Sequence, residues 1–264
     1  MISRYPARSC AELLQADPDI PSGYYWIQTT GSGAARLWCN MELTCGPNNI
    51  NGWTRVAFLN VSDSNTTTCL NDGFRLLTSS RGVRYCERLT GGYGCTEHIF
   101  PTNGINYNRV CGRVTGIQIG TVDGVERTAD LQNIYSPYID GISLTYGDPR
   151  QHIWSFIGYF SSRYPNCPCS IGSSSSTLDV VGQDFFCESG TNLESFAGDR
   201  VFDEDPLWDG MMCLSTEAPC CSGLPWFYKE LVNTVSDNIS FRVCCDQEKT
   251  DEDIAFTLVE LYVQ

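Results

Sequence analysis

The 264-residue sequence contains only two histidines, His98 and His152, and no Cys-x-x-Cys pair. Structural zinc sites use ligand pairs two to four residues apart, which are repeated and often completed by histidine. The sequence offers few such pairs, so a zinc cluster is not expected. The missing Cys-x-x-Cys also removes the usual thioredoxin-type redox motif. No Gly-x-Ser-x-Gly or other nucleophile signature occurs. We therefore expect both histidines to be structural and the protein to have no enzymatic activity.

Basic residues are also scarce, because 17 Lys and Arg stand against 31 Asp and Glu, for a net charge of −14. This balance argues against nucleic acids and anionic membrane surfaces as partners. No apolar run approaches the ~20 residues that a bilayer span requires, since "IAFTLVELYV" is short and contains Glu260. We expect no membrane insertion. The first ten residues lack the apolar centre of a secretory leader, so we expect a mature or trimmed chain.

Cysteine, in contrast, is abundant, with fifteen in the chain. Disulfides at such a density persist only in oxidising surroundings. We therefore expect a secreted, extracellular protein that is cross-linked by a framework of disulfides. The candidate disulfide residues are Cys10, Cys39, Cys45, Cys69, Cys86, Cys95, Cys111, Cys167, Cys169, Cys187, Cys213, Cys220, Cys221, Cys244 and Cys245.

The odd count leaves at least one cysteine outside intrachain pairing. Seven cysteines precede residue 120 and eight follow it, so the unpaired one lies in the first half if bridges stay within halves. It would be a buried thiol or a bridge to another chain. The doublets Cys220–Cys221 and Cys244–Cys245 are expected to reach separate partners, stapling loops that lack a large core. The alternative is a bond within a doublet.

Glycine, Ser, Thr and aromatic residues are plentiful and only 18% of residues are charged, which is typical of a loop-rich β protein. Ser9 is expected to cap a short helix that ends before Pro18. "GYYWIQT" and "ARLWCNMEL" predict a hairpin, and "GWTRVAFLNV" predicts a central strand. The closing "IAFTLVELYVQ" should be an interior strand, because an exposed apolar edge invites aggregation. Further strands are predicted at 113–120, 141–147, 152–160 and 240–245. The predicted fold class is α+β, predominantly β, with a central antiparallel sheet, short helices and long irregular loops.

Carboxylates gather in "VFDEDPLWDG", which contains Asp203, Glu204, Asp205 and Asp209. Carboxylates on irregular backbone are what calcium requires, so Asp203, Asp205 and Asp209 are candidate calcium ligands. The alternative is a solvated acidic loop.

Aromatic residues near this segment are candidate sugar-binding residues, because their flat apolar faces can stack on sugar rings. They are Trp208, Trp226, Phe227 and Tyr228, which we expect in loops. Packing between disulfides is the alternative interpretation. Glycosylation sequons occur at Asn60, Asn65 and Asn238 and fit an extracellular location.

"SCAELLQADPDIPSGYYWIQTTGSGAARLWCNMEL…NGWTRVAFLN" resembles the start of the fibrinogen-related domain. That family opens with a cysteine-headed helix, an "SGxY" turn, a strand to a second cysteine and a "GWT" strand. The resemblance implies a single domain over 1–264, with an N-terminal subdomain at 1–46 that contains a Cys10–Cys39 bridge. Residues 47–264 would form the central sheet and a cysteine-rich loop region. The family's calcium loop and tryptophan-rich pocket are not at the expected places.

The later "DGISLTYGDPRQHIWSF", "CPC", "DPLWDG", "APCC" and "ELYVQ" are similar to largely uncharacterised, cysteine-rich secreted invertebrate proteins with a fibrinogen-like start. Intelectin-type lectins offer a weaker analogy. These resemblances imply a recognition or adhesion protein with calcium-assisted, lectin-like glycan binding. Its partners would be glycans or extracellular matrix and cell-surface proteins. The alternative is a structural matrix subunit that self-assembles into filaments or covalent homo-oligomers.

Overall fold

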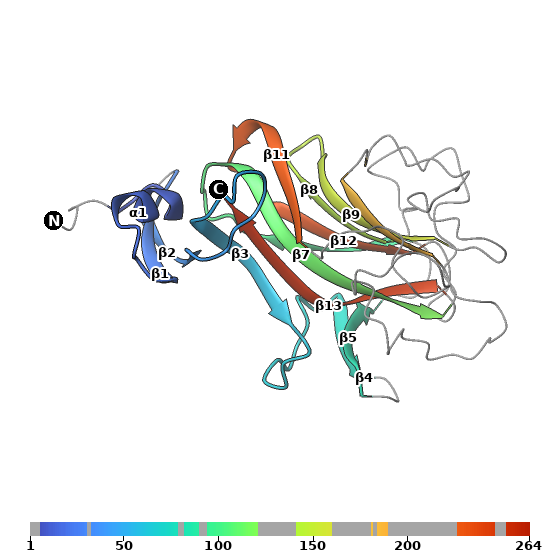
Figure 1. Ribbon diagram of the computed structural model, residues 1–264. Helices are drawn as coiled ribbons and strands as arrows, with labels where there is room; N and C mark the ends of the chain where they lie inside the picture. Colours follow the sequence, from blue (N-terminus) through green and yellow to red (C-terminus); the bar gives the residue numbers. More distant parts are fainter. Residues whose placement is uncertain are drawn as a thin grey trace.

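A computed structural model of the chain shows two β-sheets, with a small N-terminal part at one end of the molecule (Figure 1). The structure describes residues 6–30, 33–78, 82–89, 94–120, 141–159, 181, 184–189, 226–245 and 252–264, of which 117–120, 157–159, 185–189, 245 and 252–253 are described by their backbone only. The elements are α1 (Cys10–Ala16), β1 (Gly23–Thr29), β2 (Gly33–Asn40), β3 (Trp53–Asn60), β4 (Phe74–Thr78), β5 (Arg84–Arg88), β6 (Gly94–Phe100), β7 (Tyr107–Gly120), β8 (Gly141–Tyr146), β9 (Gln151–Tyr159), β10 (Phe185–Ser189), β11 (Trp226–Val235), β12 (Ile239–Cys245) and β13 (Glu252–Val263). The predominantly β character is thus confirmed.

The larger sheet has eight strands and is organised around β13. One edge of β13 pairs with β7, which in turn pairs with β11, and the other edge meets β3 and β5. From β3 the sheet continues through β2 to β1, and from β5 it continues to β4. The prediction that the closing segment is an interior strand is confirmed. Because β13 is paired on both edges, its backbone N–H and C=O groups are hydrogen-bonded and it presents no free edge to solvent.

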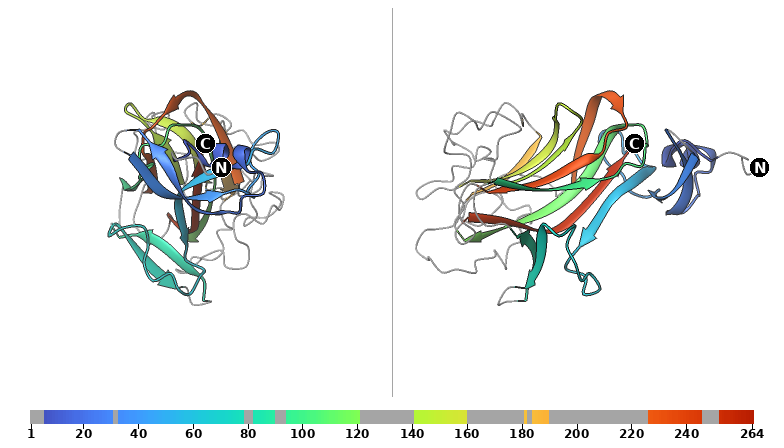
Figure 2. Two further views of the ribbon diagram at one scale, coloured as in Figure 1. Left: turned by 90° about the vertical axis from the view of Figure 1, so that its left-hand side faces the viewer. Right: turned by 180° about the vertical axis from the view of Figure 1, so that it is seen from behind.

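The smaller sheet has the order β10-β9-β8-β12-β6 and lies against one face of the larger sheet (Figures 1 and 2). Among the described strands, only β9 and β10 pair in parallel. Aromatic side chains meet between the two sheets. Phe241 of β12 lies 5.0 Å from Phe256 of β13 between ring centroids, and Phe74 lies 5.2 Å from Phe256. A buried apolar layer therefore joins the sheets, and the disulfides add to a hydrophobic core.

Four disulfides join the described cysteines: Cys10–Cys39, Cys45–Cys111, Cys69–Cys86 and Cys95–Cys244. Cys95–Cys244 links β6 to β12 across 149 residues, so the condition that bridges stay within halves is not met. Because all seven cysteines of the first half are paired, the odd one belongs to the other seven, which lie outside the described side chains. The Cys244 bond also excludes a bond within the second doublet. Several disulfides are typical of proteins in oxidising compartments.

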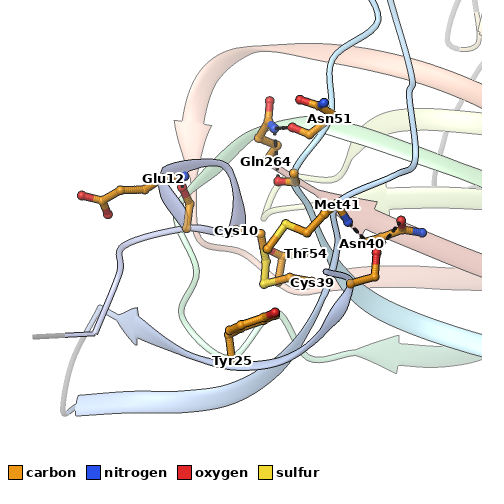
Figure 3. Close-up of a disulfide and its surroundings, with 12 residues drawn as sticks. Cys10, Glu12, Tyr25, Cys39, Asn40, Met41, Asn51, Thr54 and Gln264 are labelled. Carbon is orange, nitrogen blue, oxygen red and sulfur yellow. Dashed lines mark hydrogen bonds between the residues drawn. A yellow bond between two sulfur atoms is a disulfide. The ribbon is translucent and has the colours of Figure 1, made fainter. Parts of the chain in front are cut away.

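The N-terminal part is fixed locally by a cap and a disulfide (Figure 3). Ser9 Oγ accepts a hydrogen bond from the Glu12 backbone N–H at 3.1 Å, as the capping pattern predicts, and α1 ends at Ala16. Cys10 bonds Cys39 of β2, the pairing that the family resemblance implied. Thr54 of β3 donates its hydroxyl to Cys10 Sγ at 3.0 Å. The helix, the hairpin and the first central strand therefore meet at one disulfide.

Candidate functional site

The outward face of the β1–β2 hairpin carries exposed aromatic side chains. Side chains alternate between the two faces of a strand, so Ile27 and Leu37 are buried while Tyr24 and Trp26 project outward. The side chains of Tyr24 and Trp26 are 54% and 61% exposed, unusual for rings of this size. Tyr24 lies directly opposite Trp38, with ring centroids 5.2 Å apart in an edge-to-face arrangement.

A bulge in β3 adds two further side chains to this face. The pairing with β13 passes from Ala57–Leu261 to Arg55–Tyr262, so Val56 falls outside the one-to-one register. Arg55 and Phe58, three residues apart, therefore point to the same side, whereas a regular strand would turn them to opposite faces. Phe58 is 54% exposed. We define the aromatic band as Tyr24, Trp26, Trp38 and Phe58 together with Arg36 and Arg55.

Guanidinium groups connect the rings of the aromatic band. Arg36 lies 5.0 Å from the centre of the Tyr24 ring. Arg55 lies 4.8 Å from the Trp38 ring and 5.0 Å from the Phe58 ring. Contacts of this kind contribute roughly 0.5–1 kcal/mol each at exposed sites and restrain both partners. The band is thus a group of flat rings and positive charges across three strands.

The same face continues onto β13, β7 and β11 as a more buried polar cluster. Glu260 accepts a hydrogen bond from the Tyr262 hydroxyl at 2.5 Å and pairs with Arg113 at 2.8 Å. Arg113 in turn lies 4.8 Å from the centre of the Trp226 ring. Burial and the bond to Glu260 raise the pKa of Tyr262 to about 12, so its hydroxyl stays protonated at physiological pH. This cluster is internally neutralised and anchors the aromatic band to the centre of the sheet.

The aromatic residues proposed from sequence lie on this face in part. We expected Trp226 and Tyr228 in loops, and this prediction is wrong. Both residues lie on strand β11, where they are partly buried. Tyr228 packs beside Trp53 and over Gly46, in the loop that Cys45–Cys111 holds against the sheet. Phe227 points to the opposite face and stacks on Trp154 at 5.1 Å between ring centroids. Trp208 lies outside the described residues. Alternating aromatic residues in a predicted hairpin could have indicated the exposed rings of the aromatic band, but the sequence analysis did not select them.

The calcium prediction concerns residues that the structure does not describe. Asp203, Glu204, Asp205 and Asp209 all lie outside the described ranges. Within those ranges, no group of three or more His, Cys, Asp or Glu side chains is arranged to hold a metal ion. The calcium site therefore stays a prediction.

The three sequons lie at loops and strand ends. Asn65 and Asn238 are exposed and Asn60 is partly buried at the end of β3. Asn60 Oδ1 accepts a hydrogen bond from the Ser62 backbone N–H, and Asn238 Oδ1 accepts one from the Thr102 backbone N–H. The occupancy of all three sequons stays a prediction.

A histidine–serine contact on β9 is the arrangement most similar to catalytic machinery among the described residues. His152 Nε2 lies 2.8 Å from Ser155 Oγ. Ser155 is fully buried, however, and a nucleophile must reach its substrate. The backbone carbonyl of Asp184 accepts a hydrogen bond from the Ser155 backbone N–H. The Asp184 carboxylate forms an ion pair with Lys229. The contact satisfies buried polar groups, which agrees with the structural role expected of this histidine.

Burial also makes His152 a source of acid sensitivity. Desolvation lowers the pKa of folded His152 to about 4, whereas the unfolded chain binds the proton near 6.5. Because only the unfolded state is protonated between these values, stability falls as pH drops from 6.5 towards 4, by about 3 kcal/mol in all. Urea unfolding across this range should show a shallower loss for His152→Gln than for the wild type. Equal pH slopes would contradict a neutral, buried His152.

A depression of about 590 Å³ beside α1 is a second surface feature. Arg8 and Glu12 line it and pair with each other at 3.6 Å, so their charges cancel. Its other lining residues are small or polar, and none is aromatic. It therefore offers neither the stacking surface nor the uncompensated charge of the aromatic band.

The described part of the chain has no helix with the length and apolarity needed to cross a bilayer. A scan against protein-family models finds no match, and a search of curated proteins finds no similar protein.

Proposed function

We propose that the protein is a secreted, non-enzymatic recognition protein that binds glycans at the aromatic band. The observation that carries the proposal is the exposure of Tyr24, Trp26 and Phe58 on one sheet face. Large aromatic side chains normally bury most of their area, so an exposed group of them at one site indicates a binding surface. Flat rings beside polar edges suit the apolar faces and hydroxyl rims of sugar rings.

The restraint of the rings supports this function as well. Tyr24 and Trp38 contact each other, and Arg36 and Arg55 lie over the Tyr24 and Trp38 rings, respectively. Side chains that are already ordered lose little conformational entropy when a ligand binds. The two sheets provide a rigid base for this surface, and the four disulfides suit an oxidising extracellular environment.

A glycan array, followed by titration of the best glycan, tests the proposal. The double substitution Tyr24→Ala and Trp26→Ala should weaken binding roughly tenfold or more, because it removes two exposed rings that act as anchors. Ile99→Ala is a matched control, since Ile99 is 45% exposed but lies on β6 of the other sheet. Thermal melts should show that all variants are folded. If no glycan binds, or if the double variant binds like the wild type, the proposal is wrong.

Calcium assistance is a separable part of the proposal, based on the acidic segment at 201–210. The same titration in the presence of a chelator should give weaker binding. Unchanged affinity would remove calcium from the mechanism and leave glycan binding at the band intact.

A structural matrix subunit is the second candidate, favoured by one observation. The four disulfides of the described residues use eight of the fifteen cysteines, which leaves an odd number, seven. At least one of them therefore has no intrachain partner and is available for a bond to another chain. Intact mass measured with and without reductant tests this alternative, because a covalent oligomer separates into monomers only after reduction.

A further inference from the structure

The charge of the aromatic band differs in sign from that of the whole protein. The chain carries a net charge of −14 with only 17 basic residues. The band nevertheless contains two arginines and no acidic residue, because β2 contributes Arg36 and β3 contributes Arg55. The neighbouring charges of Arg113 and Glu260 cancel in an ion pair at 2.8 Å. The band is thus a local positive site on an acidic protein.

The partners of Arg36 and Arg55 distinguish them from other arginines of the chain. Five described arginines form ion pairs with glutamate: Arg8, Arg75, Arg109, Arg113 and Arg150. Within the described ranges, neither Arg36 nor Arg55 has a carboxylate within 4 Å or a side-chain hydrogen bond, and both guanidinium groups lie over aromatic rings. Their N–H groups therefore remain available to an external acceptor.

A guanidinium is suited to a particular kind of acceptor. Its planar set of N–H donors matches the oxygens of carboxylate and sulfate groups, and charge-assisted hydrogen bonds of this type are about twice as strong as neutral ones. Arg55 lies between Trp38 and Phe58, and Arg36 lies beside Tyr24. An anionic group bound at either arginine would thus sit next to an aromatic ring.

We infer that the ligand of the aromatic band is an acidic oligosaccharide whose sugar rings stack on Tyr24 and Trp26 while its carboxylate or sulfate groups pair with Arg36 and Arg55. This inference rests on the proposed glycan-binding function and specifies its substrate class. Neutral glycans would use the rings but leave both guanidiniums without anionic partners. The net negative charge of the rest of the protein opposes nonspecific retention of polyanions, so binding requires local contacts with the band.

Matched ligands isolate the contribution of charge. The probes are a linear oligouronate, its methyl ester, which has the same sugar backbone without the charge, and a sulfated oligosaccharide of equal length. At low salt the free oligouronate should bind roughly tenfold or more tightly than its ester. The difference should shrink in 1 M NaCl, where the Debye length is about 3 Å. The sulfated probe shows whether sulfate can replace carboxylate at the same arginines.

Matched variants assign the charge contribution to the band. Arg36→Gln with Arg55→Gln should remove the preference for the acid over its ester. Arg8→Gln is the control, because Arg8 is an exposed arginine on the N-terminal part but outside the band. Thermal melts should show that the double variant is folded. Arg55→Lys should keep part of the preference for the acid, because lysine retains the positive charge but lacks the planar N–H donors.

The outcomes separate this inference from the proposed function. Equal binding of acid and ester would overturn the acidic-ligand inference and leave glycan binding in place. An acid preference that survives loss of both arginines would also overturn it. Failure of every probe and of the glycan array would overturn both. Vesicles with anionic lipids serve as a further arm, and band-dependent binding to them without oligosaccharide binding would contradict the inference in favour of a membrane surface.

Discussion

Replacing Cys95 and Cys244 together by alanine is expected to lower the free energy of unfolding by about 5 kcal/mol and the melting temperature by about 10 °C. This disulfide closes the longest loop among the four described, with a sequence separation of 149 residues. In the chain-entropy model a disulfide stabilises by restricting the unfolded chain, and the effect grows with loop length. It also joins two directly opposed residues of β6 and β12, so its loss frees the edge of the smaller sheet.

Both cysteines are replaced because Cys245 follows Cys244 immediately and could otherwise compete for Cys95. The matched control is replacement of Cys69 and Cys86, which are separated by only 17 residues. The same model gives about 3 kcal/mol for that loop. Urea or thermal unfolding of the two variants measures the difference. A larger effect from the Cys69–Cys86 pair would show that local strain, rather than chain entropy, sets the stability of these bridges.

Phe241→Ala should destabilise the protein by about 3–5 kcal/mol, because it opens a cavity between the two sheets. Phe241 is fully buried on β12 and contacts three aromatic rings, with centroids 5.0 Å away at Phe256, 6.0 Å at Phe100 and 6.4 Å at Phe74. These rings come from both sheets, so the loss weakens the layer that joins them. Chemical unfolding of the variant measures the change in free energy.

Phe58→Ala is the control for this substitution, since the same change at a 54% exposed site should cost much less. The double variant with Phe256→Ala should show non-additivity, because the two rings are in direct contact and share the cavity. Additive effects would contradict a shared core. A loss below 1 kcal/mol for Phe241→Ala alone would contradict tight packing of the sheets.

Local features of the fold were predictable from the sequence because they depend on neighbouring residues. The serine cap of α1 and the antiparallel pairing of β1 with β2 follow from short patterns. The interior position of β13 follows from its apolar run. Strands β4, β5 and β6 were not predicted, because the glycine- and cysteine-rich sequence around them shows little periodic alternation.

The candidate site was predicted only in part. The sequence analysis considered aromatic residues as ligands but chose those at 226–228, which the structure places on a strand against the core. Exposed Tyr24 and Trp26 belong to a hairpin that was predicted correctly, yet which face of the hairpin meets solvent depends on α1, which the Cys10–Cys39 disulfide joins to the other face.

By itself, the sequence determined the chemical class of the protein: a β-rich, cysteine-stapled, acidic chain with a short capped helix and an apolar closing strand. Only the tertiary structure decided which cysteines meet across as many as 149 residues and which side chains share a face. The reason is that composition and periodicity act over a few residues, whereas partners are chosen by packing between distant strands. The bulge at Val56 illustrates this, because it alone turns Arg55 and Phe58 to the same side of the sheet.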